Sequence, residues 1–346
     1  MVDWNLATKV AEGVAALQPS GDPEPFHALV RPADEAEALV SRYTGLTPVA
    51  GALPVAEAVD RKQWIEAGLR SIRGVLDPAA AKAAQSAGPF ASVAGGAAGA
   101  VLGLQAGAIS GFLAGRVLGQ YEFPVLDPDA PARLLFVAPN LGHAATSLEA
   151  EAEPLLRWVA LHEITHALQF GGVPWLRPHL AERVRELTEA LDLDPASLFD
   201  GIPGLDDLRG LVDQVREDGV VALVLGPERR ALMDGLQAFM AVLEGYAEHV
   251  MDAVGAEVID DLPRLRAAME RRRADRTGLL RLFEKLIGMD MKLRQYELGK
   301  QFCDGVVEQA GIDGLNRVWE RPEQLPTLAE LADPAGWLAR TEPAAA

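Results

Sequence analysis

The chain has 346 residues, of which 49% are hydrophobic and 6% aromatic, and it carries a formal charge of -18. This length and apolar content suffice for a sizeable core, in one large domain or two closely packed ones. The strong negative charge argues against nucleic acid and anionic membrane surfaces as general partners. Cys303 is the single cysteine, so no disulfide can form within the chain, which fits a reducing, cytoplasmic location. The first residues lack the basic and apolar regions of a signal peptide, so none is expected.

Residues 1–86 are predicted to form an N-terminal helical region, because alanine and leucine dominate and favour helix over sheet. A first helix is followed by a Pro/Gly-rich connection and by a second helix that starts near Pro32. Helices are expected to continue over residues 53–86, with Pro54 and Pro78 in their first turns.

Glycines recur every four residues from Gly95 to Gly119, and residues 93–115 carry no charged side chain. One interpretation is a membrane-inserted helix, since this length spans a bilayer and small residues four apart let helices approach closely. The alternative is a buried helix whose bare backbone contacts its neighbours. Sparse large apolar residues and the central Gln105 favour the alternative. The glycines also drift by about 40° per step, so they do not form one dimerisation face.

Residues 133–138 are the clearest strand candidate, and no other segment is a confident strand, so the sheet is expected to be small. Residues 192–209 are rich in Asp, Pro and Gly, which is typical of a surface excursion. Long amphipathic helices are predicted up to about residue 318. The Pro-rich tail, 321–346, is expected to wrap the surface and fray. The predicted fold is therefore mainly α, an α+β arrangement with a small sheet.

The segment between Pro154 and Gly171 is predicted to be a helix with the pattern His162-Glu163-x-x-His166. At 100° per residue, the two histidines lie one turn apart on the apolar, inward face. A divalent metal between them would satisfy both buried imidazoles. Glu163, on the flank of the helix, would contact a metal-bound water without being a ligand of the metal. This arrangement is typical of zinc peptidases, with two ligands and a general base. The alternative is a core histidine pair beside a surface glutamate.

A zinc site also needs a third protein ligand and an open position. Glu244 borders the apolar stripe of a predicted helix, where a partly desolvated carboxylate must be paired or ligating. Glu248, one turn on, is the second choice or a hydrogen-bond acceptor for a ligand histidine. His249 points away from the stripe and is the third choice. Gly245 permits close approach of another element, and a buried salt bridge is the alternative role for Glu244.

The His162-Glu163-x-x-His166 and Glu244-Gly-x-Ala patterns together resemble the gluzincin metallopeptidases, whose third zinc ligand is the Glu of such a helix. The segments LHEITHALQF, LEGYAEHVMD and KLRQYELGKQF resemble more closely an uncharacterised zincin-like family of zinc metallopeptidases or hydrolases, often labelled as associated with coenzyme F420 biosynthesis. The resemblance covers about residues 85–340. It implies Zn²⁺ and a zincin-like core over 87–320, with a helical insertion at about 175–235. The insertion fills an interval between His166 and Glu244 that is longer than in typical gluzincins.

The resemblance implies hydrolysis of a peptide or small amide, in which Glu163 moves a proton from the attacking water to the leaving amine. The oxyanion donor is open among Tyr296, Arg294, Lys292 and Tyr246; the first three also fit a helix face packed on the core. One alternative function is a binding or scaffold protein with a zincin fold and no turnover. Another is a membrane-associated protein with a structural metal site. No residue pattern indicates F420 as a ligand, and the oligomeric state is open.

Overall fold

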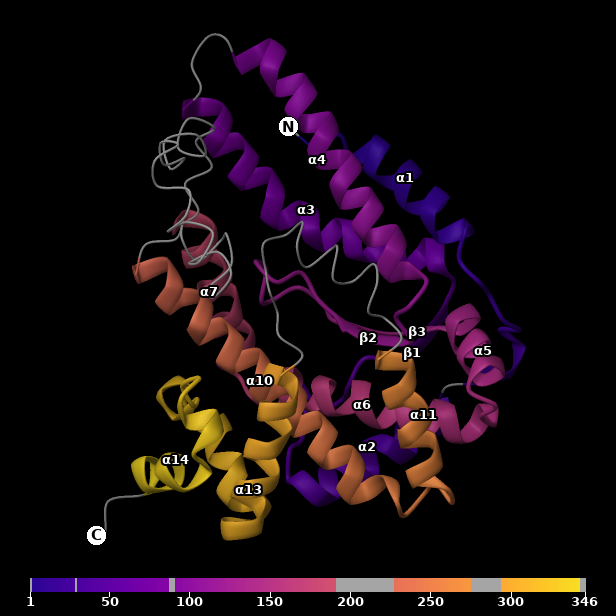
Figure 1. Ribbon diagram of the computed structural model, residues 1–346, viewed down its shortest axis with the longest axis vertical. Helices are drawn as coiled ribbons and strands as arrows, with labels where there is room; N and C mark the ends of the chain where they lie inside the picture. Colours follow the sequence, from indigo (N-terminus) through magenta and orange to yellow (C-terminus); the bar gives the residue numbers. More distant parts are fainter. Residues whose placement is uncertain (1, 29, 87–90, 191–226, 275–293, 343–346) are drawn as a thin grey trace, which may run out of the picture.

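A small sheet separates two helical layers in the computed structural model, which describes residues 2–28, 30–86, 91–190, 227–274 and 294–342 (Figure 1). The strands are β1 (Ala56–Val59), β2 (Gly119–Glu122) and β3 (Arg133–Val137). Their spatial order is β1-β3-β2, with β1 parallel and β2 antiparallel to β3. The fold is mainly helical with a small sheet, as predicted, and β3 coincides with the strand expected at 133–138.

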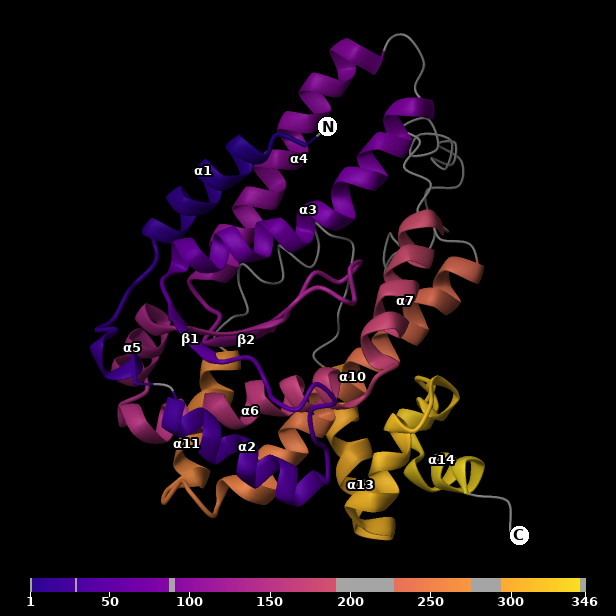
Figure 2. The same ribbon diagram turned by 180° about the vertical axis from the view of Figure 1, so that it is seen from behind.

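Helices cover both faces of this sheet. One layer contains α1 (Trp4–Ala16), α3 (Arg61–Ser86) and α4 (Ala91–Ala114). The other contains α2 (Val30–Thr44), α5 (Ala138–Ser147), α6 (Ala152–Gly172), α10 (Pro227–Gly255), α11 (Leu262–Ala274) and α13 (Arg294–Asn316). Alongside α10 and α13 lie α7 (Leu176–Ala190) and α14 (Pro334–Thr341). Short 3₁₀ turns are η1 (Glu24–Phe26), η4 (Arg317–Trp319), η5 (Pro322–Gln324) and η6 (Glu330–Ala332). The reverse view shows α2 lying across α6 (Figure 2).

The strand β3 supplies side chains to both cores. Leu134 and Phe136 are buried in the larger core, which is shared with α2, α6, α10 and α13. Leu135 and Val137 are buried in the smaller core, which is shared with α1, α3 and α4. Successive side chains of a strand point to opposite faces, so a continuous apolar run marks a strand that is covered on both sides.

The segment 53–86 differs from the prediction because it begins with β1 and not with a helix. Pro78 lies inside α3 and not in a first turn. The four residues of β1, Ala-Glu-Ala-Val, have little strand propensity of their own and depend on pairing with β3. Residues 1–86 are therefore tied to the core, since β1 belongs to the central sheet and α2 packs on α6.

The glycine repeat forms α4, which packs closely against α1. A Cβ on Gly107 would lie 2.4 Å from the Ala7 carbonyl oxygen, and one on Gly111 would lie 2.4 Å from that of Ala11. Bare backbone is therefore required at this helix crossing, as the buried-helix interpretation predicts. Among the residues that the structure describes, no helix is long and apolar enough to cross a membrane. Gly119 lies beyond α4, in β2.

The Pro-rich C-terminal segment is anchored to α13, whereas it was expected to fray. Asp333 caps α14 by accepting a hydrogen bond from the Gly336 amide at 3.0 Å. Trp337 is fully buried against Phe302, with ring centroids 5.2 Å apart, and its indole N–H donates to the Gln324 carbonyl at 2.8 Å. Trp337, together with the buried Leu331, thus anchors a Pro-rich segment that was expected to fray. Of the insertion predicted at about 175–235, α7 and the start of α10 are described, while the excursion at 192–209 lies outside the described residues.

Candidate metal centre

The helix α6 carries the His-Glu-x-x-His pattern through the larger core. Its apolar residues are buried on several faces, and it ends at Gly171-Gly172. His162 and His166 lie one turn apart, and their Nε2 atoms are 3.2 Å from each other. The two side chains are only 21% and 13% exposed. The spacing in the sequence therefore brings two imidazole nitrogens to one point at the edge of the core.

The third side chain, Glu244, comes from α10, which packs against α6. Its Oε2 lies 3.7 Å from His162 Nε2, and its Oε1 lies 3.8 Å from His166 Nε2. Beside it, the backbones of α10 and α13 touch, since a Cβ on Gly245 would lie 2.2 Å from the carbonyl carbon of Gly299. This close approach, which was expected for Gly245, lets α13 pack directly against α10 beside Glu244.

These three side chains fit a zinc ion. Their ligand atoms all lie within 4.8 Å of one another. Tetrahedral zinc with bonds of about 2.0–2.2 Å separates its ligand atoms by about 3.3–3.6 Å. The two Nε2 atoms are 3.2 Å apart, and each lies 3.7 or 3.8 Å from one of the two Glu244 oxygens, so these separations are close to that range. Two imidazoles and one carboxylate also leave a fourth position open, as catalytic zinc sites do.

Gln169 orients His166, a role that the sequence pattern did not reveal. Its side chain is fully buried, and its Nε2 donates to the Leu243 carbonyl at 3.2 Å. The amide oxygen is therefore turned to His166 Nδ1, at 2.8 Å. An acceptor at Nδ1 places the ring proton there and leaves Nε2 for a metal. The sequence contained one sign of this role, because Gln169 is a polar residue three positions after His166 on the inward face of the helix.

Glu163 is buried beside β2, at 6% exposure. The backbone N–H of Tyr121 donates to its Oε2 at 3.0 Å. Burial, followed by the nearby Glu244 carboxylate, raises the pKa of Glu163 from 4.5 to about 8, and the Tyr121 hydrogen bond opposes that rise. Glu163 is thus a desolvated acid held next to the ligand set, a situation that favours proton transfer near neutral pH.

The space for Glu163 is provided by Gly119 in β2. A Cβ at this position would lie 2.5 Å from Glu163 Cγ and 2.9 Å from Cδ. Any other residue at position 119 would therefore displace the carboxylate. Side chains alternate along a strand, so Gly119 and Tyr121 face α6 while Gln120 and Glu122 face α3, where they contact Trp64 and Ser71.

The metal-free protein is expected to lose stability as the pH rises. Between the unfolded pKa of 4.5 and the folded pKa of about 8, folded Glu163 holds a proton that the unfolded chain has released. The free energy of unfolding therefore falls across this window. Chelator-treated wild type should show a larger drop in thermal midpoint than Glu163→Gln between about pH 5.5 and about pH 8. Equal drops in the two proteins would contradict this expectation.

His249, the third choice for a ligand because it points away from the apolar stripe, is buried between other helices. Its Nδ1 lies 2.7 Å from Asp304 Oδ1, and its Nε2 lies 2.8 Å from the Tyr43 hydroxyl oxygen. Both ring nitrogens are engaged, so His249 is not available as a ligand. The helix α10 contacts α6, α13 and α2, so it is covered on several sides. The direction of its one apolar stripe therefore does not show which of its other residues are buried.

The other predicted residues lie in different places. Tyr246 is fully buried, where its hydroxyl donates to Asn316 Oδ1 at 2.7 Å, and burial raises the pKa of its phenol. These contacts place it in the core and not at the ligand set. Glu248 lies one turn beyond Glu244 on α10, and its role as hydrogen-bond partner of a ligand histidine or as an alternative ligand stays a prediction. Lys292 and the side chains of Arg294 and Tyr296 lie outside the described residues.

The chain is similar to known proteins over nearly its whole length. The sequence profile of the zincin-like metallopeptidase family matches residues 2–338, so it includes the N-terminal helices as well. A crystal structure from Chloroflexus aurantiacus, described as that of a candidate hydrolase with a novel fold, is 29% identical over 98% of each chain, with a TM-score of 0.71. No curated protein shows significant sequence similarity. The match over nearly the whole chain shows that this protein belongs to the zincin-like metallopeptidase family.

Proposed function

We propose that the protein is a zinc-dependent hydrolase that cleaves peptide or small amide bonds. The observation that carries this proposal is the buried, protonatable Glu163 beside His162, His166 and Glu244. A purely structural metal site, or a binding protein without turnover, needs only the ligands. Burying an additional carboxylate costs free energy, so its presence next to the ligands favours catalysis.

Each residue has a distinct role in this proposal. His162, His166 and Glu244 would hold zinc, which supplies a water of lowered pKa and polarises the scissile carbonyl. A bound divalent cation would favour the ionised form of Glu163, in contrast to the metal-free protein. Glu163 would then accept a proton from the attacking water and deliver it to the leaving amine. The Tyr121 amide holds Oε2 of Glu163, which leaves Oε1 for the proton transfer.

The position of β2 supports a peptide as substrate. Among the described strands, β2 lies at an edge of the sheet, with β3 on one side. The Tyr121 N–H points to Glu163, so the side of β2 away from β3 faces the centre. An extended peptide that pairs with a strand edge gains main-chain hydrogen bonds. Such pairing would bring its backbone to Glu163 in a fixed orientation.

The test combines metal analysis with a peptide screen. Protein purified without chelators should contain about one zinc ion per chain and should cleave members of a quenched fluorescent peptide library. A chelator should abolish cleavage, and added zinc should restore it. Absence of zinc would refute the metal centre. Bound zinc without cleavage of any peptide would instead favour a binding or scaffold role.

Gly119→Ala is expected to lower hydrolysis by about 100-fold while zinc stays bound, because a displacement of about 1 Å in a catalytic group has effects of this size. The added methyl group would push Glu163 away from the Tyr121 amide. Zinc binding should be spared because the atoms nearest to this methyl group all belong to Glu163 and not to the three ligands. Gly13→Ala is the matched control, since a Cβ there meets no atom within 4 Å. Full activity of Gly119→Ala would show that the position of Glu163 does not limit the rate.

A further inference from the structure

A row of three aromatic side chains leads away from the metal centre along β2. Tyr121, whose N–H donates to Glu163, is followed two residues later by Phe123. Both rings contact Phe170 of α6, with ring centroids 6.1 and 4.9 Å from that of Phe170. Phe170 itself lies one turn after His166. This aromatic row therefore begins at the candidate ligands and ends beyond the last residue of β2.

Arg177 lies at the far end of the aromatic row. It belongs to the first turn of α7, which follows α6 along the chain and packs against α10 (Figure 1). Its Cζ is 4.5 Å from the centre of the Phe123 ring, a contact that holds the cation over an aromatic face. Burial raises the pKa of Tyr121, and the charge of Arg177 opposes that rise, so the guanidinium also lies near this second ring.

The guanidinium of Arg177 has donors that lack an acceptor. Its Nη2 donates to the Ala130 carbonyl at 2.7 Å. Its Nε is buried without a hydrogen-bond partner, and its Nη1 is neither buried nor hydrogen-bonded. Among the residues that the structure describes, no carboxylate oxygen lies within 4.0 Å of these nitrogens. Buried donors are nearly always paired, so an acceptor from outside the described chain fits this position.

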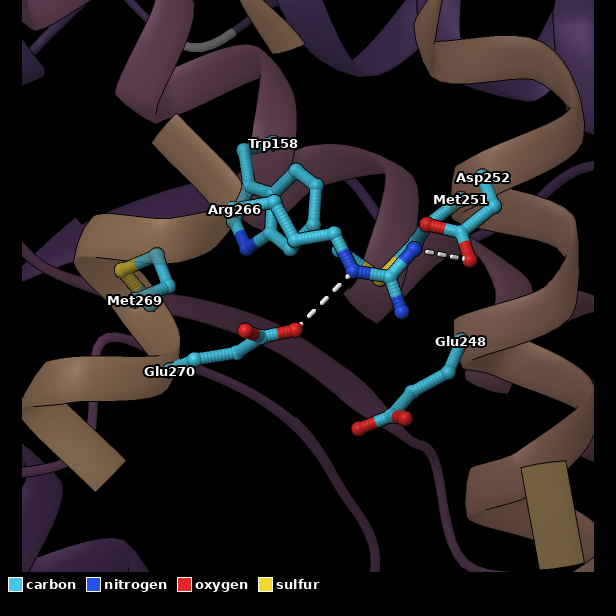
Figure 3. Close-up of a pocket in the computed structure, with 7 residues that line it drawn as sticks. All are labelled: Trp158, Glu248, Met251, Asp252, Arg266, Met269 and Glu270. Atoms are coloured by element: carbon cyan, nitrogen blue, oxygen red, sulfur yellow. Dashed lines mark hydrogen bonds and ion pairs between the residues drawn. The ribbon is translucent and has the colours of Figure 1, made fainter. Parts of the chain in front are cut away.

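Other half-buried arginines of the protein are satisfied by the protein itself. Arg266 forms ion pairs with Asp252 and Glu270 at the pocket between α10 and α11 (Figure 3). Arg61 has no carboxylate partner, but it donates to three backbone carbonyls and to a side-chain amide. Arg177 has a single hydrogen bond, in a chain with 50 acidic residues. Its open donors thus distinguish it from the structural arginines.

The aromatic row also sets the distance between Arg177 and the metal centre. The four residues from His166 to Phe170 advance about 6 Å along the helix. Further separations of 4.9 Å to Phe123 and 4.5 Å to the guanidinium follow. Arg177 is therefore on the order of 10–15 Å from the ligands, which corresponds to about three or four residues of an extended peptide.

A carboxylate is the acceptor that matches this position. The planar guanidinium binds a carboxylate through two parallel hydrogen bonds, and the charge makes these bonds stronger than those between neutral groups. The neighbouring aromatic rings keep water away from one side of the guanidinium and so strengthen its attraction for an anion. In a peptide, carboxylates are found on acidic side chains and at the C-terminus.

We propose that Arg177 binds a carboxylate of the peptide substrate a few residues away from the cleaved bond. The proposal rests on the hydrolase function above and assigns its substrate class. β2 runs from the centre toward Arg177, so a peptide antiparallel to β2 places the residues before the cleaved bond there, and an acidic side chain supplies the carboxylate. A parallel peptide places the residues after the bond there, and its C-terminus can supply the carboxylate as well.

The kinetic test uses quenched peptides that differ only by glutamate or glutamine at one of the positions around the cleaved bond. We expect glutamate at one position to raise kcat/KM by about tenfold or more, as a hydrogen bond to a charged group does. Arg177→Gln should bring the glutamate-to-glutamine ratio toward one, mainly through KM. Arg185→Gln, an equal charge change on the exposed side of α7, should keep the wild-type ratio. A loss of folded protein alone would slow both peptides equally and leave the ratio unchanged.

Peptides with free and with amidated C-termini separate the two sources of the carboxylate. A glutamate preference that persists in amidated peptides assigns the site to an acidic side chain. A preference for the free C-terminus that disappears in Arg177→Gln assigns it to the end of the peptide, and either result supports the proposal. Ratios near one in both series, in a wild type that cleaves peptides, overturn it and leave the hydrolase function intact. A preference that Arg177→Gln retains also overturns it.

A binding measurement without turnover keeps the two proposals apart. In zinc-free protein with ¹⁵N-labelled arginine, N-acetylglutamate amide should shift the Nε–H resonance of Arg177, and N-acetylglutamine amide should not. The resonance is identified by its loss in Arg177→Lys. This shift in a protein that cleaves no peptide would retain the carboxylate site and refute the hydrolase function. Equal responses to the two probes would refute the carboxylate site.

Discussion

Glu163→Gln is expected to lower peptide hydrolysis by two to four orders of magnitude, the usual contribution of a general acid-base group, while zinc content stays unchanged. Glutamine has nearly the same shape and still accepts the hydrogen bond that the Tyr121 amide donates at 3.0 Å. It cannot take a proton from water at neutral pH. The rate and the zinc content are measured on the same preparation, by peptide cleavage and by elemental analysis.

His162→Ala is the informative comparison for this variant. It removes one of the three ligands, so zinc and activity should both be lost, whereas Glu163→Gln should lose activity alone. Activity of Glu163→Gln within about tenfold of wild type would assign the proton transfer to another group. Loss of zinc from Glu163→Gln would indicate that Glu163 supports the metal and not the reaction.

Gly111→Ala is expected to lower the free energy of unfolding by about 2 kcal/mol or more, within the range known for overpacked sites. The new methyl group would lie 2.4 Å from the Ala11 carbonyl oxygen and 2.8 Å from Val14 Cβ, so α4 must move away from α1. In a helix without this contact, the same change stabilises by up to about 1 kcal/mol. Denaturant unfolding measures the difference.

Gly13→Ala in α1 provides the matched control for this prediction. A Cβ at Gly13 meets no atom within 4 Å, so only the favourable helix propensity remains and stability should rise slightly. Opposite signs for the two Gly→Ala changes would establish that α1 and α4 pack backbone to backbone in solution. A small stabilisation at both positions would contradict the helix contact.

The sequence alone determined the parts of the protein that depend on short-range periodicity. Two histidines four residues apart in a helix must share a face, so the pair at His162 and His166 followed from spacing alone. The same reasoning ranked Glu244 first among later acids because it borders an apolar stripe, and the structure brings it to both histidines. The strand at 133–138 was also recognisable, because an apolar run that is buried on both faces has a pattern of its own.

The tertiary structure decided which elements cover each face, since periodicity marks a buried face but not its partner. The short strands β1 and β2 exist through pairing with β3, so their own residues carry little signal. Gly119 seemed to continue a helical repeat, but its position in β2 makes room for Glu163. His249 lies away from the apolar stripe of α10, but α13 and α2 cover that side of the helix as well. Contacts between residues distant in the sequence thus turned a recognisable His-Glu-x-x-His helix into a candidate metal centre with a buried carboxyl group beside it.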